Sequence, residues 1–365
     1  MGPNRPSGRI QGLDVIRGIA VAFVLLRHAN QQTYGGAGIL GVTMFFALSG
    51  YLITGILLKD IQRHGRVRYG RFYRNRAIRL LPPLVAMLAV YALITLTINP
   101  DHDTRSVPKS ILIGLFYISN YPHIEISNAL GHLWTLATEE QFYIVWPVIL
   151  AIGVKIRSLA VVLILSAIAI VGTLIYSLNY YDPRFGFVYK LPTSWAIAMI
   201  IGAAAQIYRP HIAPIVARVG RLRTPLVLIL IALLATRAGG PDIKGEPNTY
   251  LYLVPAIAVG TIALIYLMEA WERIPSPVWY PALWLGTISY AAYLWNLPIL
   301  QWNYPLRTMD ERIMVTTLTI GAAILSWFLI ERPSHRFRTW LDRRGQEQRA
   351  AVTISPVETP TPVKS

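Results

Sequence analysis

The sequence predicts an all-α, polytopic integral membrane protein, a helical bundle of about ten transmembrane helices with both termini in the cytoplasm. Three observations lead to this fold class. Of the 365 residues, 54% are hydrophobic and only 14% are charged, whereas soluble domains carry about 25% charged residues. Long apolar runs recur along the chain, and the mean hydropathy is +0.45. The Lys and Arg residues between these runs are unevenly divided between alternate connections.

Ten apolar stretches are candidate membrane spans, since a spanning helix needs about 20 residues. The seventh is the shortest of them. The run from Ile111 to Ile118 is too short to span, and we expect it to re-enter the membrane or to lie at its surface. The polar start of the chain leads into a span that itself contains charges, so we expect no cleavable signal peptide. The ten stretches are residues 13–30, 38–58, 80–99, 133–154, 158–177, 192–208, 224–236, 250–270, 280–301 and 313–331.

The basic residues between the stretches predict the orientation. If the chain alternates sides, 24 of the 34 Lys and Arg residues lie on the side of the N-terminus and 8 on the opposite side. The remaining two, Arg17 and Arg27, lie inside the first stretch. Basic connections face the cytoplasm, so both termini are predicted to be cytoplasmic. The net charge of +16 then reflects membrane topology, and we expect no nucleic-acid partner.

The chain divides into three parts by composition. Residues 1–12 form a short cytoplasmic segment, residues 13–340 the transmembrane domain, and residues 341–365 a cytoplasmic tail. The end of this tail is rich in Pro and Thr without apolar periodicity, a pattern typical of disorder. The longest external connection runs from Pro100 to Leu130. Because the chain has no cysteine, disulfide bonds and thiolate chemistry are excluded, and we expect no metal site.

Arg17 and His28 are ionisable groups inside the first apolar stretch, where such groups are costly and usually functional. Eleven residues at about 100° each amount to roughly three turns, so both side chains lie on one helix face, about 16 Å apart. This spacing predicts a polar seam through the membrane protein. The alternatives are an arginine that extends to the membrane surface and a histidine that caps a helix end. Asp14, one turn before Arg17, can pair with it.

Six motifs follow in order along the chain, and together they resemble the membrane-bound acyltransferase type 3 family over roughly residues 10–340. That family transfers acyl groups, often acetyl, to exported sugars, lipids and some antibiotics. The motifs are RGIAVAFVLLRH, MFFALSGYLITGIL, RFYRNRAIRLLPP, GHLWTLATEEQFYIVWP, ISYAAYLWNLP and FLIERPSHRF.

The resemblance implies that His28 is catalytic and that Arg17 is its partner. A neutral imidazole can take a proton from a hydroxyl that attacks a thioester, or it can carry the acyl group covalently. Glu139 and Glu140 match the family's Glu-Glu-Gln-Phe-Tyr run. Adjacent residues on a helix point about 100° apart. We therefore expect one carboxylate to hold His28 in one tautomer or to accept a proton, and the other to pair with an arginine.

The resemblance also implies binding residues. Arginines suit the phosphates of coenzyme A. Arg76 and Arg79 match the family's arginine motif and can share a helix face, and Arg71 and Arg74 can share another. Many members of the family have histidine at the position of Asn296, which cannot titrate. His132 is a further candidate polar ligand. The candidate substrate-binding residues are Ser49, Gln141, Tyr143, Tyr290, Tyr293 and Asn296.

We therefore expect a multi-pass bacterial plasma-membrane enzyme that moves an acyl group from acyl-coenzyme A, its co-substrate, to a hydroxyl group. The acceptor is expected to contain a sugar, as in a surface polysaccharide, a glycolipid or a macrolide-like molecule. We expect no permanently bound cofactor. The main alternative is a transporter or lipid flippase that uses the buried Arg and His as a substrate or proton path. The sequence gives no indication of the oligomeric state.

Overall fold

The computed structural model describes residues 10–100 and 104–354, with side chains up to residue 344. Within these residues the regular elements are helices, which confirms the predicted class, and one isolated bridge joins Tyr34 and Gly240. The α-helices are α1 (Gln11–Ala29), α2 (Gly35–His64), α3 (Tyr69–Thr97), α4 (Val107–Leu115), α5 (Trp134–Lys155), α6 (Leu159–Tyr180), α7 (Thr193–Ala217), α8 (Arg223–Ala235), α9 (Val254–Met268), α10 (Tyr280–Thr287), α11 (Ser289–Trp302), α12 (Met309–Ser326) and α13 (Arg332–Ile354). Short 3₁₀ turns are η1 (Asn128–Leu133), η2 (Val188–Lys190), η3 (Gly220–Leu222) and η5 (Pro277–Trp279), and π-helical turns are η4 (Thr249–Leu253) and η6 (Trp327–Glu331).

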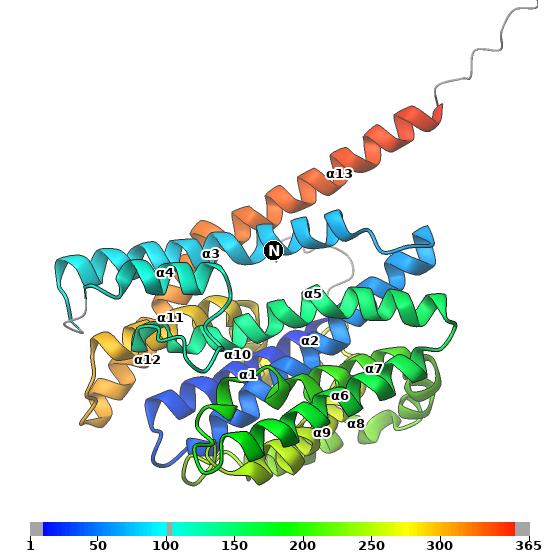
Figure 1. Cartoon of the computed structure of the whole chain (residues 1–365). Coiled ribbons are helices and arrows are strands. Elements are labelled where there is room, and N and C mark those ends of the chain that lie inside the picture. Colours follow the sequence, from blue (N-terminus) through cyan, green and yellow to red (C-terminus); the bar gives the residue numbers. More distant parts are fainter. Residues whose placement is uncertain (1–9, 101–103, 355–365) are drawn as a thin grey trace, which may run out of the picture.

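Most helices share one long axis, and the chain turns at the two ends of the bundle (Figure 1). At one end, Arg27 of α1 forms an ion pair of 2.7 Å with Asp242, which lies in the connection between α8 and η4. At the opposite end, the backbone N–H of Gly12 donates to the carbonyl oxygen of Trp271 at 3.0 Å. Helix α1 therefore runs from one end of the bundle to the other.

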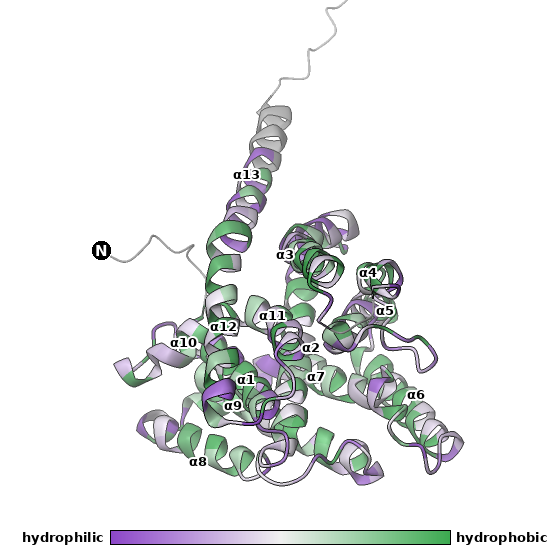
Figure 2. Ribbon diagram, turned by 90° about the vertical axis from the view of Figure 1, so that its left-hand side faces the viewer, coloured by the Kyte–Doolittle hydropathy of each residue, from purple (hydrophilic) through white to green (hydrophobic). Residues whose placement is uncertain are grey.

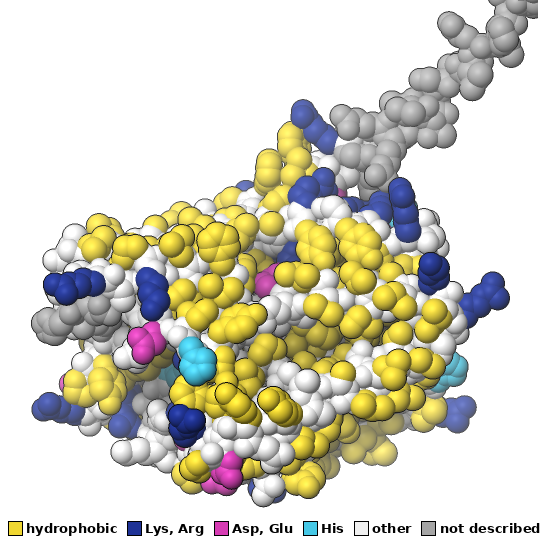
Figure 3. Space-filling view, in the orientation of Figure 1, with side chains coloured by type: hydrophobic (Ala, Val, Ile, Leu, Met, Phe, Trp, Pro, Cys, Tyr) yellow, Lys and Arg dark blue, Asp and Glu magenta, His cyan; other side chains and the backbone are white. Residues whose placement is uncertain are grey.

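The surface between the two ends is largely apolar. In Figure 3, hydrophobic side chains cover much of the middle of the face, while most Lys and Arg side chains gather towards its edges. On α6, Ile164 and Ile168 have exposed fractions of 57% and 62%, and Figure 2 places this helix at the periphery. Contiguous exposed apolar surface suits lipid contact. The protein is a multi-pass helical membrane protein.

Six helical segments in the described part of the chain are long and apolar enough to cross a membrane. The count of ten therefore stays a prediction, as does the orientation of the termini. The stretch 224–236 corresponds to α8, which has only 13 residues. The stretch 280–301 is interrupted at Ile288, between α10 and α11. The six segments are Gly35–His64, Tyr69–Thr97, Leu159–Tyr180, Val188–Ala217, Thr249–Met268 and Met309–Arg344.

Three segments extend further as helix than the sequence patterns predict. The basic segment before residue 80 belongs largely to α2 and α3, because α2 ends only at His64 and α3 begins at Tyr69. The run around Ile111 lies in the nine-residue helix α4. Helix α13 continues to Ile354, into the tail predicted to be disordered; this part contains good helix formers such as Arg, Gln and Ala. Residues 1–9 and 355–365 lie outside the described residues.

Glycines at helix contacts bring backbones of the bundle close together. A Cβ atom added to Gly18 of α1 would lie 1.8 Å from the carbonyl oxygen of Ala282 in α10, and one added to Gly286 would lie 1.8 Å from that of Asp14. Gly50 of α2 makes a similar approach to α7, where the corresponding distance to a backbone oxygen is 2.0 Å. Small residues let helix backbones approach closely in membranes, and Gly18, Gly286 and Gly50 have this role here.

We predict that Gly18→Ala lowers the stability of the detergent-solubilised protein by about 1–3 kcal/mol, because the added methyl group forces α1 away from α10. Gly172→Ala is the matched control, since a Cβ at Gly172 of α6 meets no atom within 4 Å. The control should be neutral or slightly stabilising, because alanine favours helix more than glycine does. Equal melting temperatures for the two variants would contradict the close contact of α1 with α10.

Candidate active site

A cavity of about 270 Å³ lies between α1, α2, α3, α5 and α11, and we call it the Arg17 cavity. It collects residues that are far apart in the sequence but were predicted to act together. Apart from Thr135 and Ser289, the polar residues that line it are predicted site residues. These are Arg17, Ser49, Arg76, Arg79, Glu139, Glu140, Tyr143, Tyr290 and Tyr293.

Two of the three arginines in this cavity have carboxylate partners. Arg17 lies 3.2 Å from Asp14, one helical turn earlier, as predicted. The Arg76 side chain donates to both oxygens of Glu140, at 2.8 Å and 3.0 Å, and its guanidinium carbon lies 3.3 Å from the centre of the Tyr143 ring. A buried guanidinium with a carboxylate on its edge and an aromatic ring on its face is held in one orientation.

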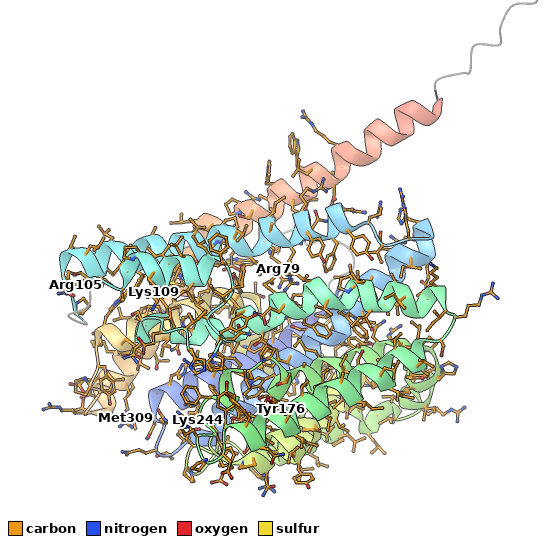
Figure 4. All side chains as sticks on the ribbon, viewed as in Figure 1. Arg79, Arg105, Lys109, Tyr176, Lys244 and Met309 are labelled. Atoms are coloured by element: carbon orange, nitrogen blue, oxygen red, sulfur yellow. The ribbon has the colours of Figure 1, made fainter. Side chains whose placement is uncertain are left out.

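Arg79 is the exception. It lines the Arg17 cavity and lies midway along the bundle (Figure 4). Among the described residues it has no carboxylate within ion-pair distance, unlike Arg17 and Arg76. A guanidinium in a cavity wall without an ion-pair partner leaves its N–H donors available to an anionic ligand.

The two glutamates of α5 have different partners, as predicted for adjacent positions on a helix. Glu140 pairs with Arg76, whereas Glu139 accepts a hydrogen bond of 2.7 Å from the Ser49 hydroxyl of α2. Both line the Arg17 cavity, which His28 does not. The prediction that one of these carboxylates orients His28 is therefore wrong, because His28 has Asn296 as its side-chain partner. The alternative, that one of them accepts a proton, stays a prediction.

His28 lines a second cavity of about 850 Å³, which we call the His28 cavity. The two cavities share no lining residue. Aromatic rings, amides and charged groups mix in the wall of the His28 cavity, a composition that suits a polar ligand with apolar ring faces. The wall includes Arg27, His28, Asn30, Gln31, Gln32, His132, Trp134, Tyr189, Lys190, Asp242, Gln301, Tyr304 and Arg312.

Asn296 of α11 orients the His28 ring. Its side-chain oxygen accepts a hydrogen bond from Nδ1 of His28. Because an amide oxygen carries no proton, Nδ1 of the neutral ring holds the hydrogen and Nε2 keeps its lone pair. Asn296, which does not titrate, thus orients His28, a role that we predicted for Glu139 or Glu140. Asn296 does not belong to the lining of either cavity.

The open end of the His28 cavity carries an ion pair. Asp242 contacts Arg27 at 2.7 Å and accepts a hydrogen bond of 3.0 Å from the Gln31 amide. Burial by itself raises the pKa of Asp242, but the Arg27 guanidinium outweighs this effect and holds the pKa below its usual value. The carboxylate is therefore ionised at neutral pH and fixes the wall of the cavity.

The hydroxyl groups of Thr135 and Tyr293 lie where the linings of the two cavities approach each other. The hydroxyls of Thr135 and Tyr293 lie 2.6 Å apart, and both residues line the Arg17 cavity. The Tyr293 hydroxyl also donates to the carbonyl oxygen of His132 at 2.9 Å, and His132 lines the His28 cavity. We call Thr135 and Tyr293 the partition. It connects the lining of the Arg17 cavity to His132 in the lining of the His28 cavity.

Besides Asn296, three predicted binding residues lie away from both cavities. Arg71 and Arg74 contact Asp342 of α13 at 3.1 Å and 3.0 Å, at the end of the bundle opposite His28. Gln141 points to the other side of α5, where its amide forms hydrogen bonds with Asn120 and the carbonyl oxygen of Tyr117. These residues support the packing of α13 and of the 117–120 connection.

Sequence reasoning missed Thr135 and gave little weight to His132. Thr135 lies in the run from Trp134 to Glu140, and His132 lies two residues before that run. The signal was available, because Thr135 precedes Glu139 by four residues and therefore lies on the same face of α5.

Comparison with known proteins places this site in a family. A family model described as an acyltransferase domain matches residues 10–332. A protein of Staphylococcus aureus strain COL with the name "Putative O-acetyltransferase SACOL0978" is 31% identical over 373 residues, which cover 89% of this chain and 57% of that protein. The peptidoglycan O-acetyltransferase OatA of Listeria monocytogenes is 28% identical over 357 residues, with 89% and 55% covered.

This chain thus spans little more than half the length of these curated relatives. No solved structure matches it. The family model covers the helices that carry both cavities, from α1 to the start of α13. On the strength of that match, the chain belongs to the acyltransferase type 3 family of membrane proteins.

Proposed function

We propose that this protein transfers an acyl group, most simply acetyl, from acyl-coenzyme A to a hydroxyl group of a sugar-containing acceptor. The observation that supports it best is the pair of cavities along α1, one with Arg17 and an unpaired Arg79 and the other with His28. Donor and acceptor would enter from opposite ends of the bundle and meet near the partition. The charge bias of the connections assigns the donor to the cytoplasmic side.

The Arg17 cavity suits the thioester arm of the donor. Its volume of about 270 Å³ is at the lower limit of small-molecule sites, which measure about 300–1,000 Å³, so the nucleotide of coenzyme A would remain outside it. Arg79 would bind an anionic part of the donor, and Arg17 would polarise the thioester carbonyl. Arg76 and Glu140 would hold the wall in place.

His28 supplies the base in this proposal. Its Nε2 takes the proton from the acceptor hydroxyl, the hydroxyl oxygen attacks the thioester carbon, and the carbon–sulfur bond breaks. The coenzyme A thiolate then leaves and is protonated. A covalent route remains open, in which Nε2 first receives the acyl group and passes it to the hydroxyl. In both routes the hydrogen bond from Nδ1 to Asn296 keeps Nε2 reactive.

The His28 cavity, with a volume of about 850 Å³, is large enough for a sugar-containing acceptor. Trp134, Tyr189 and Tyr304 offer ring faces, and the amides of its wall offer hydrogen bonds to hydroxyls. Sugars expose both kinds of surface. The acceptor would be a surface polysaccharide, a glycolipid or a macrolide-like molecule, and the name of the Listeria relative favours the first class.

The transporter alternative has less support. It needs one path through the membrane, whereas the two cavities have separate linings and the partition lies between them. Purified protein in lipid nanodiscs decides between the two. Label that passes from acetyl-coenzyme A to a hydroxyl compound or to water supports the enzyme. Substrate that crosses vesicle membranes without cleavage of the thioester supports the carrier.

We predict that His28→Ala lowers acyl transfer by about 10²–10⁴-fold, because the general base is lost. The measurement is the alkali-labile acetate on the envelope of cells that produce the variant, normalised to the amount of folded protein. His211→Ala is the control, since His211 is exposed on α7 and contacts only the ring of Tyr208 among the described aromatic residues. Unchanged acetate in the His28 variant would remove this histidine from the mechanism.

We predict that Arg79→Gln raises the dissociation constant for acetyl-coenzyme A by about 10-fold or more, since a hydrogen bond to a charged group contributes about 1.5–3 kcal/mol. Lys155→Gln removes an exposed positive charge at the end of α5 and serves as the control. Titration calorimetry of the purified proteins gives both constants. If the two variants bind the donor equally well, Arg79 is not the donor's partner.

A further inference from the structure

A second imidazole lies in the wall of the His28 cavity. His132 is only 4% exposed, and both of its ring nitrogens are buried without a hydrogen bond of acceptable geometry among the described residues. The backbone of Leu294 approaches the ring but does not satisfy it. A buried polar atom without a partner is unfavourable and rare. Two such atoms on one ring, in the wall of a polar cavity, favour a ligand-binding role over a structural one.

The surroundings of His132 hold the ring in place. His132 lies in the short turn η1, directly before α5. Its carbonyl oxygen accepts hydrogen bonds from the hydroxyls of Thr135 at 3.2 Å and Tyr293 at 2.9 Å. Its ring leans on the Tyr293 ring, with 5.3 Å between the ring centres. The contacts of the partition therefore fix the backbone and the ring face of His132 and leave its nitrogens free.

We propose that His132 binds the acceptor, through hydrogen bonds from its ring nitrogens to the sugar beside the hydroxyl that is acylated. This inference rests on the proposed function and adds a substrate-contacting residue to it. A neutral imidazole offers one donor and one acceptor, which matches a sugar hydroxyl, itself a donor and an acceptor. His28 and His132 then have separate tasks in one cavity. His28 takes the proton from the acceptor hydroxyl, and His132 holds the sugar ring that carries this hydroxyl.

The position of His132 explains why its nitrogens are not satisfied by protein groups. A binding site that waits for a hydroxyl compound exposes donors and acceptors that only the ligand pairs. Such a site rejects molecules without the matching hydroxyl, because they leave the imidazole unpaired. His132 would thus select sugars over plain lipid alcohols of similar reactivity.

The test compares His132→Leu with His132→Gln in two measurements. The first is alkali-labile acetate on the cell envelope, normalised to folded protein from size-exclusion chromatography. The second is the dissociation constant of acetyl-coenzyme A for the purified full-length protein. We expect His132→Leu to lose at least 10-fold of the envelope acetate and to bind acetyl-coenzyme A within 2-fold of the wild type, since each hydrogen bond lost from a buried polar site costs about a factor of 10.

The glutamine variant separates binding from structure. Glutamine also carries a donor and an acceptor, so His132→Gln should retain more envelope acetate than His132→Leu. His123→Leu is the matched control, because His123 is exposed on the 117–128 connection and does not line the His28 cavity. It should leave envelope acetate unchanged.

Two results would overturn the proposal. One is full envelope acetate in His132→Leu. The other is an equal loss in the leucine and glutamine variants accompanied by weaker acetyl-coenzyme A binding, which would assign His132 to the packing of the Arg17 cavity. Failure of the proposed function looks different: wild-type protein would then neither bind acetyl-coenzyme A nor change the envelope acetate.

Discussion

The close contact between α1 and α10 is the constraint on which the site depends. Gly18 and Gly286 allow the two backbones to touch, and this draws α1 into the centre of the bundle, where most of its residues are buried. A helix at the periphery would present Arg17 and His28 to lipid at a high free-energy cost. In the centre, the same two side chains face cavities that other helices complete. The contact between Gly18 and Gly286 thus places Arg17 and His28 beside cavities instead of beside lipid.

The charged groups that line the Arg17 cavity differ in whether they have a close partner. Arg17 and Arg76 are neutralised by Asp14 and Glu140, while Glu139 is stabilised by the hydroxyl of Ser49. Breaking such buried pairs is strongly unfavourable, so they are fixed features of the resting protein. Arg79 stands apart, because its positive charge is uncompensated by a close carboxylate within the described residues. Within the described residues, the Arg17 cavity thus contains a cation without an ion-pair partner, and the His28 cavity contains an imidazole, that of His132, whose nitrogens lack a hydrogen bond.

Much of this site follows from local patterns. The helical period places Arg17 and His28 on one face, predicts the partner Asp14, and separates the tasks of Glu139 and Glu140. Other features depend on contacts between distant segments. The hydrogen bond from His28 to Asn296 spans 268 positions, and the pairing of Arg71 with Asp342 spans 271. No periodicity within one helix reveals such partners. The count of spans is also harder to predict, since α8 is short and Ile288 interrupts a continuous apolar run.

The partition of Thr135 and Tyr293 has a consequence for the energetics of the whole cell. A continuous file of water molecules through this bundle would dissipate any proton gradient across the membrane that holds it. Two hydroxyls 2.6 Å apart leave no room for water between them. Because the two cavities also share no lining residue, we expect a bilayer with many copies of the protein to keep its electrical resistance.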